Sequence, residues 1–212
     1  MQIHCHQVIP KPMLDLQTKS DIWLRDITFT ENKIYQIVAP SGTGKTSLTH
    51  ILFGIRHDFT GTILFDNTDI SSFKNHDWIT IRKSHISIVF QGLGLFPELN
   101  IPENIAIKNK LTHYKTDEEI QFLIQTCGLD SHTHKNAGIL SFGQRQRLAI
   151  IRALCQPFDF ILLDEPFSHL DEKNTEICMH ILEEELQKRN ASAIITSLNK
   201  QFYTTNQHVL HL

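Results

Sequence analysis

The sequence predicts an α/β fold: a parallel β-sheet covered by helices, an antiparallel β flank beside it, and a small helical subdomain. Three observations predict this class. Short apolar, β-branched runs alternate with segments of helical periodicity. A glycine-containing loop lies between one such run and a helix. From residue 92 to about residue 140 the β-branched runs disappear, which indicates a helical insertion.

The composition fits one domain of this class. The chain has 212 residues, of which 41% are hydrophobic, enough for a sizeable core. Its formal net charge is -3 and it has no block of lysine or arginine, so we expect no nucleic-acid partner. No apolar run approaches the roughly 20 residues that cross a bilayer, and the first residues lack a signal-like apolar region. We therefore expect a protein that is soluble by itself.

The four cysteines, Cys5, Cys127, Cys155 and Cys178, lie far apart and show no C-x-x-C spacing. This usage favours reduced thiols in a cytosolic protein over disulfides or a zinc site. The first of them sits between two histidines, but strand alternation puts those rings on one face and the thiol on the other.

The antiparallel flank is expected from the start of the chain. Residues 1–8 and 22–29 contain short alternating segments, with turn-forming residues between them. A strand at residues 62–65 follows Gly61. A polar stretch then leads to a buried strand at residues 86–90, which ends at Gln91.

The loop at residues 39–46 has the pattern of a phosphate site. It follows the apolar run 34–38, a candidate buried strand, and precedes a helix at residues 47–53 that a glycine ends. Backbone N–H groups in such a loop and the positive end of the helix dipole converge on an anion. Lys45 then places its ammonium on the β- and γ-phosphates of a nucleoside triphosphate, and Thr46 offers its hydroxyl to Mg²⁺. The predicted nucleotide-binding residues of this loop are Ala39, Pro40, Ser41, Gly42, Thr43, Gly44, Lys45 and Thr46.

Ala39 departs from the pattern G-x-x-x-x-G-K-[ST], whose first residue is glycine. If the backbone has a positive φ there, alanine costs about 1 kcal/mol. If φ is negative, the change is harmless. Gly42 and Gly44 let the backbone approach phosphate without a Cβ in the way.

The insertion contains two predicted helices, near residues 102–109 and 116–127. Thr116 and Glu119 form a capping box that starts the second helix, and Gly128 ends it.

A further helix starts at Ser141 and runs to about residue 157, with Gln144 as the capping-box partner of the serine. These side chains either only start the helix or also bind a phosphate at its N-terminus. The residues by themselves leave both uses open.

Two adjacent acids, Asp164 and Glu165, end the apolar strand that begins at residue 160. They lie at the carboxyl edge of the predicted sheet, where open α/β folds bind ligands. Strand alternation points the two carboxylates in different directions. We expect Asp164 to reach the Mg²⁺ held by Thr46, and Glu165 to face the γ-phosphate, where it accepts a proton from, or orients, the attacking water.

The remaining elements follow from capping and periodicity. Asp171 caps a long helix that ends at about residue 189 and has one apolar stripe. Residues 193–196 form the last core strand, which Ser197 follows, and residues 209–212 add a short edge strand.

In their order along the chain, these motifs resemble the ATP-binding subunit of ABC (ATP-binding cassette) transporters over nearly the full length. Residues 39–46 resemble the Walker A motif of that family, and Gln91 its Q-loop. LSFGQRQR at residues 140–147 resembles the signature motif, ILLDEP at residues 161–166 Walker B, and SHLD at residues 168–171 the D-loop.

The resemblance implies one domain, 1–212: a P-loop NTPase (RecA-like) core with its β flank at residues 1–91 and 157–212, and a helical subdomain at 92–156. It also implies dimers, homodimers or paralogous heterodimers, in which two ATP molecules each lie between the Walker A loop of one chain and the signature motif of the other. Further implied roles are catalysis by Glu165 and Lys45, γ-phosphate contacts across the dimer from Ser141, Gly143 and Gln144, and Mg²⁺ coordination by Thr46, Gln91 and Asp164.

The implied partner is an integral membrane permease that contacts the surface near Gln91. The implied location is the cytoplasm, peripheral on the inner face of the cell membrane. The resemblance therefore implies an ATPase that energises transport through a separate permease. The alternative is a weakly hydrolysing, ATP-gated regulatory or scaffold subunit of a membrane complex. A cassette acting on DNA or ribosomes is disfavoured by the lack of a basic surface signal.

Three positions depart from the pattern of the family. Phe142 stands where a glycine is usual, and Ser197 replaces the expected switch histidine. Serine donates a hydrogen bond to phosphate but carries no charge, so we expect Ser197 to take a catalytic position with slow hydrolysis. No aromatic residue stands where the family stacks adenine; Pro10 or Pro12 takes the place, and Trp23 is a poorly aligned substitute.

Overall fold

The computed structural model describes residues 1–15, 19–198 and 207–212, and one of its two sheets is antiparallel. This sheet has the strand order β2-β1-β4-β5. Its strands are β1 (Ile3–Pro10), β2 (Asp26–Phe29), β4 (Phe59–Phe65) and β5 (Thr68–Asp69). The predicted antiparallel flank is therefore confirmed, although β2 begins four residues later than expected because residues 22–25 precede it as bends and turns.

The second sheet is parallel and has the order β6-β7-β8-β3-β9. Its strands are β3 (Ile34–Val38), β6 (Ile86–Val89), β7 (Phe160–Asp164), β8 (Ser192–Ser197) and β9 (Gln207–His211). The register pairs Val38 with Ser197 and Asp164 with Thr196, so the carboxyl ends of β3, β7 and β8 meet at one edge.

Six α-helices lie in the described part of the chain: α1 (Lys45–Leu52), α2 (Asn75–Ser84), α3 (Ile101–Asn109), α4 (Asp117–Thr126), α5 (Phe142–Leu154) and α6 (Glu172–Arg189). Short 3₁₀ helices occur at η1 (Lys11–Met13), η2 (Ile70–Ser72), η3 (Asp130–His132) and η4 (Ala137–Ile139). Within the described residues, none of the helices has the length and apolar character to cross a bilayer.

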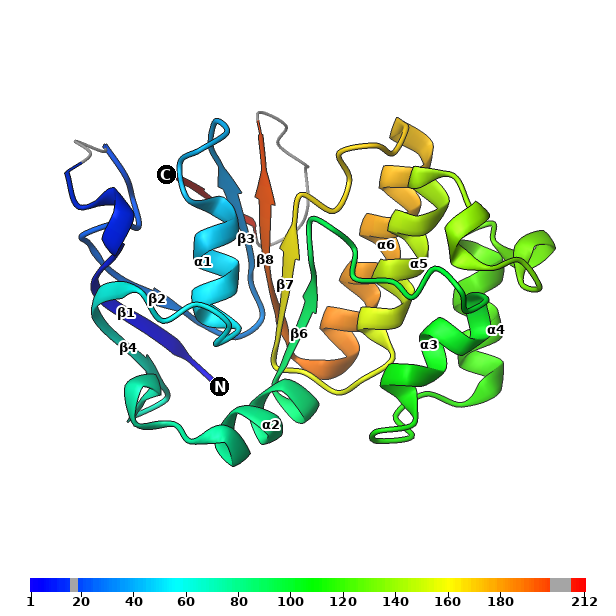
Figure 1. Cartoon of the computed structure of the whole chain (residues 1–212), viewed down its shortest axis with the longest axis horizontal. Helices are drawn as coiled ribbons and strands as arrows, with labels where there is room; N and C mark the ends of the chain where they lie inside the picture. Colours follow the sequence, from blue (N-terminus) through cyan, green and yellow to red (C-terminus); the bar gives the residue numbers. More distant parts are fainter. Residues whose placement is uncertain (16–18, 199–206) are drawn as a thin grey trace.

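Strand alternation explains how both faces of the parallel sheet are covered. In β7, Phe160 and Leu162 pack into the cluster that contains α1 and the antiparallel sheet. Ile161 and Leu163 point the other way, into the cluster formed with the helices from α3 to α6. Figure 1 shows α1 between the two sheets, with α5 and α6 on the opposite side of the parallel sheet. A strand buried on both faces is apolar throughout, as its sequence indicated.

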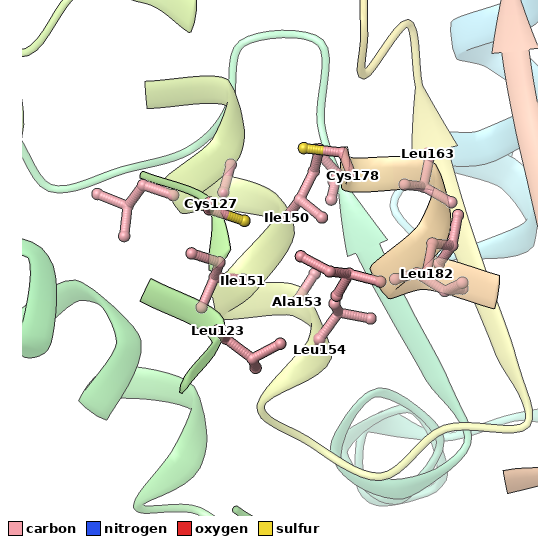
Figure 2. Close-up of a cluster of buried hydrophobic side chains, with 14 of the residues drawn as sticks. Leu123, Cys127, Ile150, Ile151, Ala153, Leu154, Leu163, Cys178 and Leu182 are labelled. Atoms are coloured by element: carbon pink, nitrogen blue, oxygen red, sulfur yellow. The ribbon is translucent and has the colours of Figure 1, made fainter. Parts of the chain in front are cut away.

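The cluster that contains Ile161 and Leu163 joins α4 to the rest of the molecule. Figure 2 shows Leu123 and Cys127 at the end of α4 facing side chains from α5, from β7 and from α6. Cys127 and Cys178, on the two sides of this seam, are buried free thiols. The α5, β7 and α6 residues labelled there are Ile150, Ile151, Ala153, Leu154, Leu163, Cys178 and Leu182.

Capping residues were the most accurate part of the prediction. Thr116, Ser141 and Asp171 each accept a hydrogen bond from a backbone N–H of their own first turn. The helix α2 was not predicted, since residues 71–77 are largely polar. Its start is fixed instead by a hydrogen bond from the Lys74 N–H to the Asp77 carboxylate (2.8 Å).

Candidate nucleotide-binding site

The phosphate loop connects β3 to α1. Gly42 and Gly44 have φ values of 83° and 97°, a left-handed backbone that glycine adopts without a Cβ clash. Ala39 is not among the residues with positive φ, so alanine there carries no backbone penalty. The departure from glycine at this position is therefore harmless, one of the two outcomes considered above.

Lys45 lies almost enclosed within this loop, with 5% of its side chain exposed. Its ammonium donates hydrogen bonds to the carbonyl oxygens of Ala39 and Pro40, both at 2.8 Å. The same nitrogen lies 3.3 Å from Oε1 of Glu165. The predicted phosphate-binding cation and the predicted catalytic acid are thus brought into direct contact.

Trp23 supports the loop from the antiparallel side. Its indole Nε1 donates a hydrogen bond to the carbonyl of Thr43 (3.1 Å). A Cβ placed on Gly44 would lie 2.9 Å from the sulfur of Met13 and 3.1 Å from the Trp23 ring, so only glycine fits there. Because Trp23 is 2% exposed, its ring packs against the loop and offers no free face to adenine, and the suggested stacking role is wrong.

Gln91 and Thr46 complete the group around Glu165. The Gln91 amide nitrogen lies 3.5 Å from Oε2 of Glu165, and the Gln91 amide oxygen lies 3.5 Å from the Thr46 hydroxyl. Four side chains from three separate parts of the chain therefore converge at the carboxyl edge of the parallel sheet: Lys45, Thr46, Gln91 and Glu165.

Asp164 lies beneath this group and is 1% exposed. Its Oδ1 accepts a hydrogen bond from the Thr196 hydroxyl (2.7 Å), whereas its Oδ2 is buried without a hydrogen-bond partner among the described residues. The Thr196 hydroxyl oxygen also accepts from the Glu165 N–H (3.1 Å). The strand β7 ends at Asp164, and the backbone turns at Glu165, where φ is 51°. The two carboxylates have different partners, as expected, but this turn and not strand alternation separates them.

The residues present suit a hard divalent cation. Asp164 presents an unpaired buried carboxylate oxygen, and Thr46 and Gln91 present a hydroxyl and an amide oxygen nearby in the same edge of the sheet. Oxygen donors of this kind are the ligands that Mg²⁺ takes beside nucleotide phosphates.

Ser197 ends β8 next to the loop. Its carbonyl accepts a hydrogen bond from the Ala39 N–H (3.1 Å), and it is largely buried. The serine therefore lies at the sheet edge that carries the other predicted site residues.

The turn at Ser141 lies elsewhere. It starts α5, on the other side of the parallel sheet from α1 (Figure 1). The Ser141 hydroxyl accepts from the Gln144 N–H (3.2 Å) and the Gln144 side chain accepts from the Ser141 N–H (2.9 Å), which confirms the capping box. No hydrogen bond or ion pair recorded for the described residues joins Ser141, Gly143 or Gln144 to the Lys45 loop. Within one chain, the two predicted phosphate-binding ends are separate.

Sequence reasoning missed three residues that hold the site in shape. Thr196 orients both acids, as described above. Gln146 on α5 donates to the hydroxyl of Ser168 (3.1 Å) and accepts from the N–H of His169 (3.2 Å). Arg152, also on α5, donates to the carbonyls of Leu93 and Gly94, both at 2.7 Å, and so fixes the segment after Gln91.

None of these three carried a signal of its own. Gln146 and Arg152 lie on a helix whose periodicity was clear, but their partners are distant in sequence. For Arg152, burial lowers the pKa of the guanidinium. Its hydrogen bonds to the two carbonyl oxygens lie within this buried setting.

Comparisons with known proteins identify the family of the chain. A family model described as "ABC transporter" matches residues 25–168. The chain is 33% identical over 180 residues to the "Lipoprotein-releasing system ATP-binding protein LolD" of Buchnera aphidicola subsp. Schizaphis graminum (strain Sg), covering 84% of this chain and 76% of that relative. It is 38% identical over 157 residues to the "Spermidine/putrescine import ATP-binding protein PotA" of Protochlamydia amoebophila (strain UWE25). That alignment covers 72% of this chain and 40% of the relative.

Among solved structures, a similar fold is the one described as "Dimeric Structure of MJ0796, a Bacterial ABC Transporter Cassette". The TM-score is 0.77 at 24% identity, and the match covers 92% of this chain and 87% of that one. At this identity the likeness establishes the shared fold.

Proposed function

The chain belongs to the ABC transporter family, as the ATP-binding subunit that hydrolyses ATP to energise transport, and from this membership we propose how its residues perform that work. We propose that Lys45 and the loop around it bind the triphosphate, that Thr46, Gln91 and Asp164 hold Mg²⁺, and that Glu165 acts on the attacking water. Mg²⁺, when bound, would neutralise charge on the phosphates.

The contact between Lys45 and Glu165 carries this proposal. At 3.3 Å, the carboxylate occupies a place beside the ammonium that phosphate oxygens take in a triphosphate complex. Binding of phosphate draws Lys45 toward the nucleotide and leaves Glu165, held by its backbone bond to Thr196, to orient water and accept its proton. The same interaction keeps the cation paired in the absence of nucleotide.

The substitution Glu165→Gln tests the assignment. The amide is close in size to the carboxylate but cannot accept a proton, so we expect phosphate release to fall by at least about 100-fold while ATP still binds. Exposed Glu172→Gln, in the first turn of α6, serves as the matched control and should leave turnover unchanged. Turnover close to that of wild type in the Glu165 variant would show that another group activates the water.

We propose further that two chains bind ATP between them, as a homodimer or a paralogous heterodimer. The separation of the Ser141 turn from the Lys45 loop supports this proposal, because both are suited to phosphate but one chain does not bring them together. In the dimer, Ser141, Gly143 and Gln144 of one chain complete the site of the other. Light scattering of the Glu165→Gln variant should show a dimer with MgATP and a monomer without nucleotide; a monomer under both conditions would refute the shared site.

The partner in transport is, in our proposal, an integral membrane permease, with this chain at the cytoplasmic face of the membrane. The names of its relatives include lipoprotein release and spermidine or putrescine import, and the permease selects the cargo. We also propose that residues 92–156 act as the helical subdomain of a single domain, 1–212. Co-purification of the tagged chain from membranes should recover an integral membrane protein; recovery of this chain alone would contradict the pairing.

A second candidate, an ATP-gated regulatory or scaffold subunit with slow turnover, is favoured by Ser197. At that position a serine lacks the charge of an imidazole. In this case wild-type phosphate release is already low, and Glu165→Gln changes it little. Measuring both rates separates the two candidates.

A further inference from the structure

Two rings face each other between the first turn of α5 and the segment that follows Glu165. The ring centroids of Phe142 and His169 are 4.2 Å apart, with their planes tilted by 51°. The guanidinium of Arg145 lies 5.2 Å from the centroid of the Phe142 ring. Although Phe142 begins a helix and is 38% exposed, its ring therefore has defined contacts.

Hydrogen bonds fasten the same two segments together. His169 Nδ1 lies 2.9 Å from the Ser168 hydroxyl, and that hydroxyl accepts from the buried Gln146 side chain (3.1 Å). Packing at Gly143 is equally close, because a Cβ there would lie 3.2 Å from the carbonyl oxygen of His169. The first turn of α5 and residues 168–170 thus form one packed unit.

This unit reaches Glu165. The Gln146 side-chain nitrogen lies 3.5 Å from the Glu165 carbonyl oxygen, as well as close to Ser168. At its other end the unit carries Ser141, whose exposed hydroxyl precedes Phe142 directly. A continuous series of contacts therefore runs from the turn proposed to serve the nucleotide of the partner chain to the backbone of the acid proposed to serve the nucleotide of its own chain.

We propose that Phe142 and His169 form a clasp that positions the Ser141 turn relative to Glu165. Through this clasp, a contact between Ser141 and the nucleotide of the partner chain determines the position of Glu165 in the chain that carries Ser141. Both residues are positioning residues, since neither touches the reacting atoms of the nucleotide bound in its own chain. The inference depends on the proposed two-chain ATP site. At residue 142 the ring replaces the glycine of the family pattern.

The test is a double-mutant cycle of Phe142→Leu and His169→Ala. Leucine keeps apolar bulk and removes the ring. Each single variant should lower kcat by about threefold to tenfold, the size expected when one aromatic contact is lost in the active arrangement. The double variant should be no slower than the slower single variant, because both changes remove the same contact. Binding of a fluorescent ATP analogue to the dilute single chain should be unchanged, since the Lys45 loop is intact.

Three further variants separate positioning from a merely structural role. Phe142→Tyr keeps the ring and should restore kcat. Phe122→Leu, on α4 and 57% exposed, is the matched control and should leave kcat unchanged. The clasp is refuted if the two single effects on kcat multiply in the double variant. It is also refuted if the fall in kcat is no larger than the loss of folded protein, as judged from the melting temperature of each variant. If the wild type shows no turnover, that result counts against the proposed function and not against the clasp. The same double-mutant cycle is then carried out in the Glu165→Gln background, with ATP-driven dimerisation as the measured quantity.

Discussion

Thr196 determines where two neighbouring acids point. Its hydroxyl donates to Asp164 and accepts from the Glu165 N–H, so one oxygen on β8 fixes the end of β7. The different directions of the two carboxylates were predicted from strand alternation, but in the structure they arise from the turn at Glu165. Thr196 could not, because it is 32 positions away from Asp164 and only the strand register brings them together.

We expect Thr196→Val to lower the free energy of unfolding by about 2 kcal/mol, since Asp164 and the Glu165 N–H both lose a buried partner. Turnover should fall by about tenfold as Glu165 loses its orientation. Urea unfolding and phosphate release measure the two effects. Thr196→Ser keeps the hydroxyl and serves as the control; equal losses in both variants would mean that the methyl group, not the hydrogen bonds, matters.

At the scale of elements, α6 is tied to the segment before α4 by buried charges. The Lys115 ammonium lies 2.9 Å from Oε1 of Glu185, and Arg189 pairs with the other oxygen of the same carboxylate. Arg189 also donates to the carbonyls of Leu154 and Gln156 at the end of α5, both at 2.8 Å. Burial alone would raise the pKa of Glu185, but Arg189 and Lys115 outweigh it and hold that pKa below the usual 4.5.

The substitution Glu185→Gln should therefore destabilise the fold by about 3 kcal/mol at neutral pH, because Arg189 and Lys115 both lose a buried anion. Of its ion pairs within the described residues, Lys115 then keeps only the one with the more exposed Glu119. The carboxylate has a depressed pKa in the folded state, so its contribution is complete above pH 4.5 and is lost as the pH falls below that value. The difference in the free energy of unfolding between wild type and variant should therefore become smaller in urea titrations carried out at progressively lower pH.

Glu184→Gln is the matched control for this experiment. Glu184 lies one position earlier on α6 but is 42% exposed, and its pairs with His180 and Lys188 are at the surface. We expect a change of less than about 0.5 kcal/mol. If the difference in the free energy of unfolding between wild type and Glu185→Gln stays constant through the acid range, Glu185 contributes by packing and not by charge.

Which elements were predictable also has a physical reason. Helices with an N-cap and a wide apolar face, such as α4 and α6, were found from the sequence. The helix α2 was missed because only Trp78 among its residues is buried. Trp78 packs against Phe65 and Phe73, which lie outside the helix, and such contacts are not contained in a local pattern.

At the scale of the whole molecule, nucleotide binding should stabilise the fold, because the site draws residues from three distant parts of the chain. At 100 times Kd, a ligand adds about 2.7 kcal/mol, which for a chain of this size raises Tm by about 5–10 °C. The Glu165→Gln variant avoids ATP consumption during a thermal scan. We expect EDTA to remove most of the shift, and Mg²⁺ without ATP to produce none; an equal shift in EDTA would contradict the proposed Mg²⁺ ligands.

The hydrogen bond from Trp23 to Thr43 also gives the molecule an intrinsic optical reporter. The chain has two tryptophans, and the other, Trp78, lies on α2 away from the phosphate loop. In a Trp78→Phe variant, the remaining indole fluorescence arises from a ring that touches the loop at Gly44. We expect its emission to change on titration with MgATP and to stay constant on titration with adenosine, which lacks phosphates, so that loop movement can be timed in stopped flow without any label.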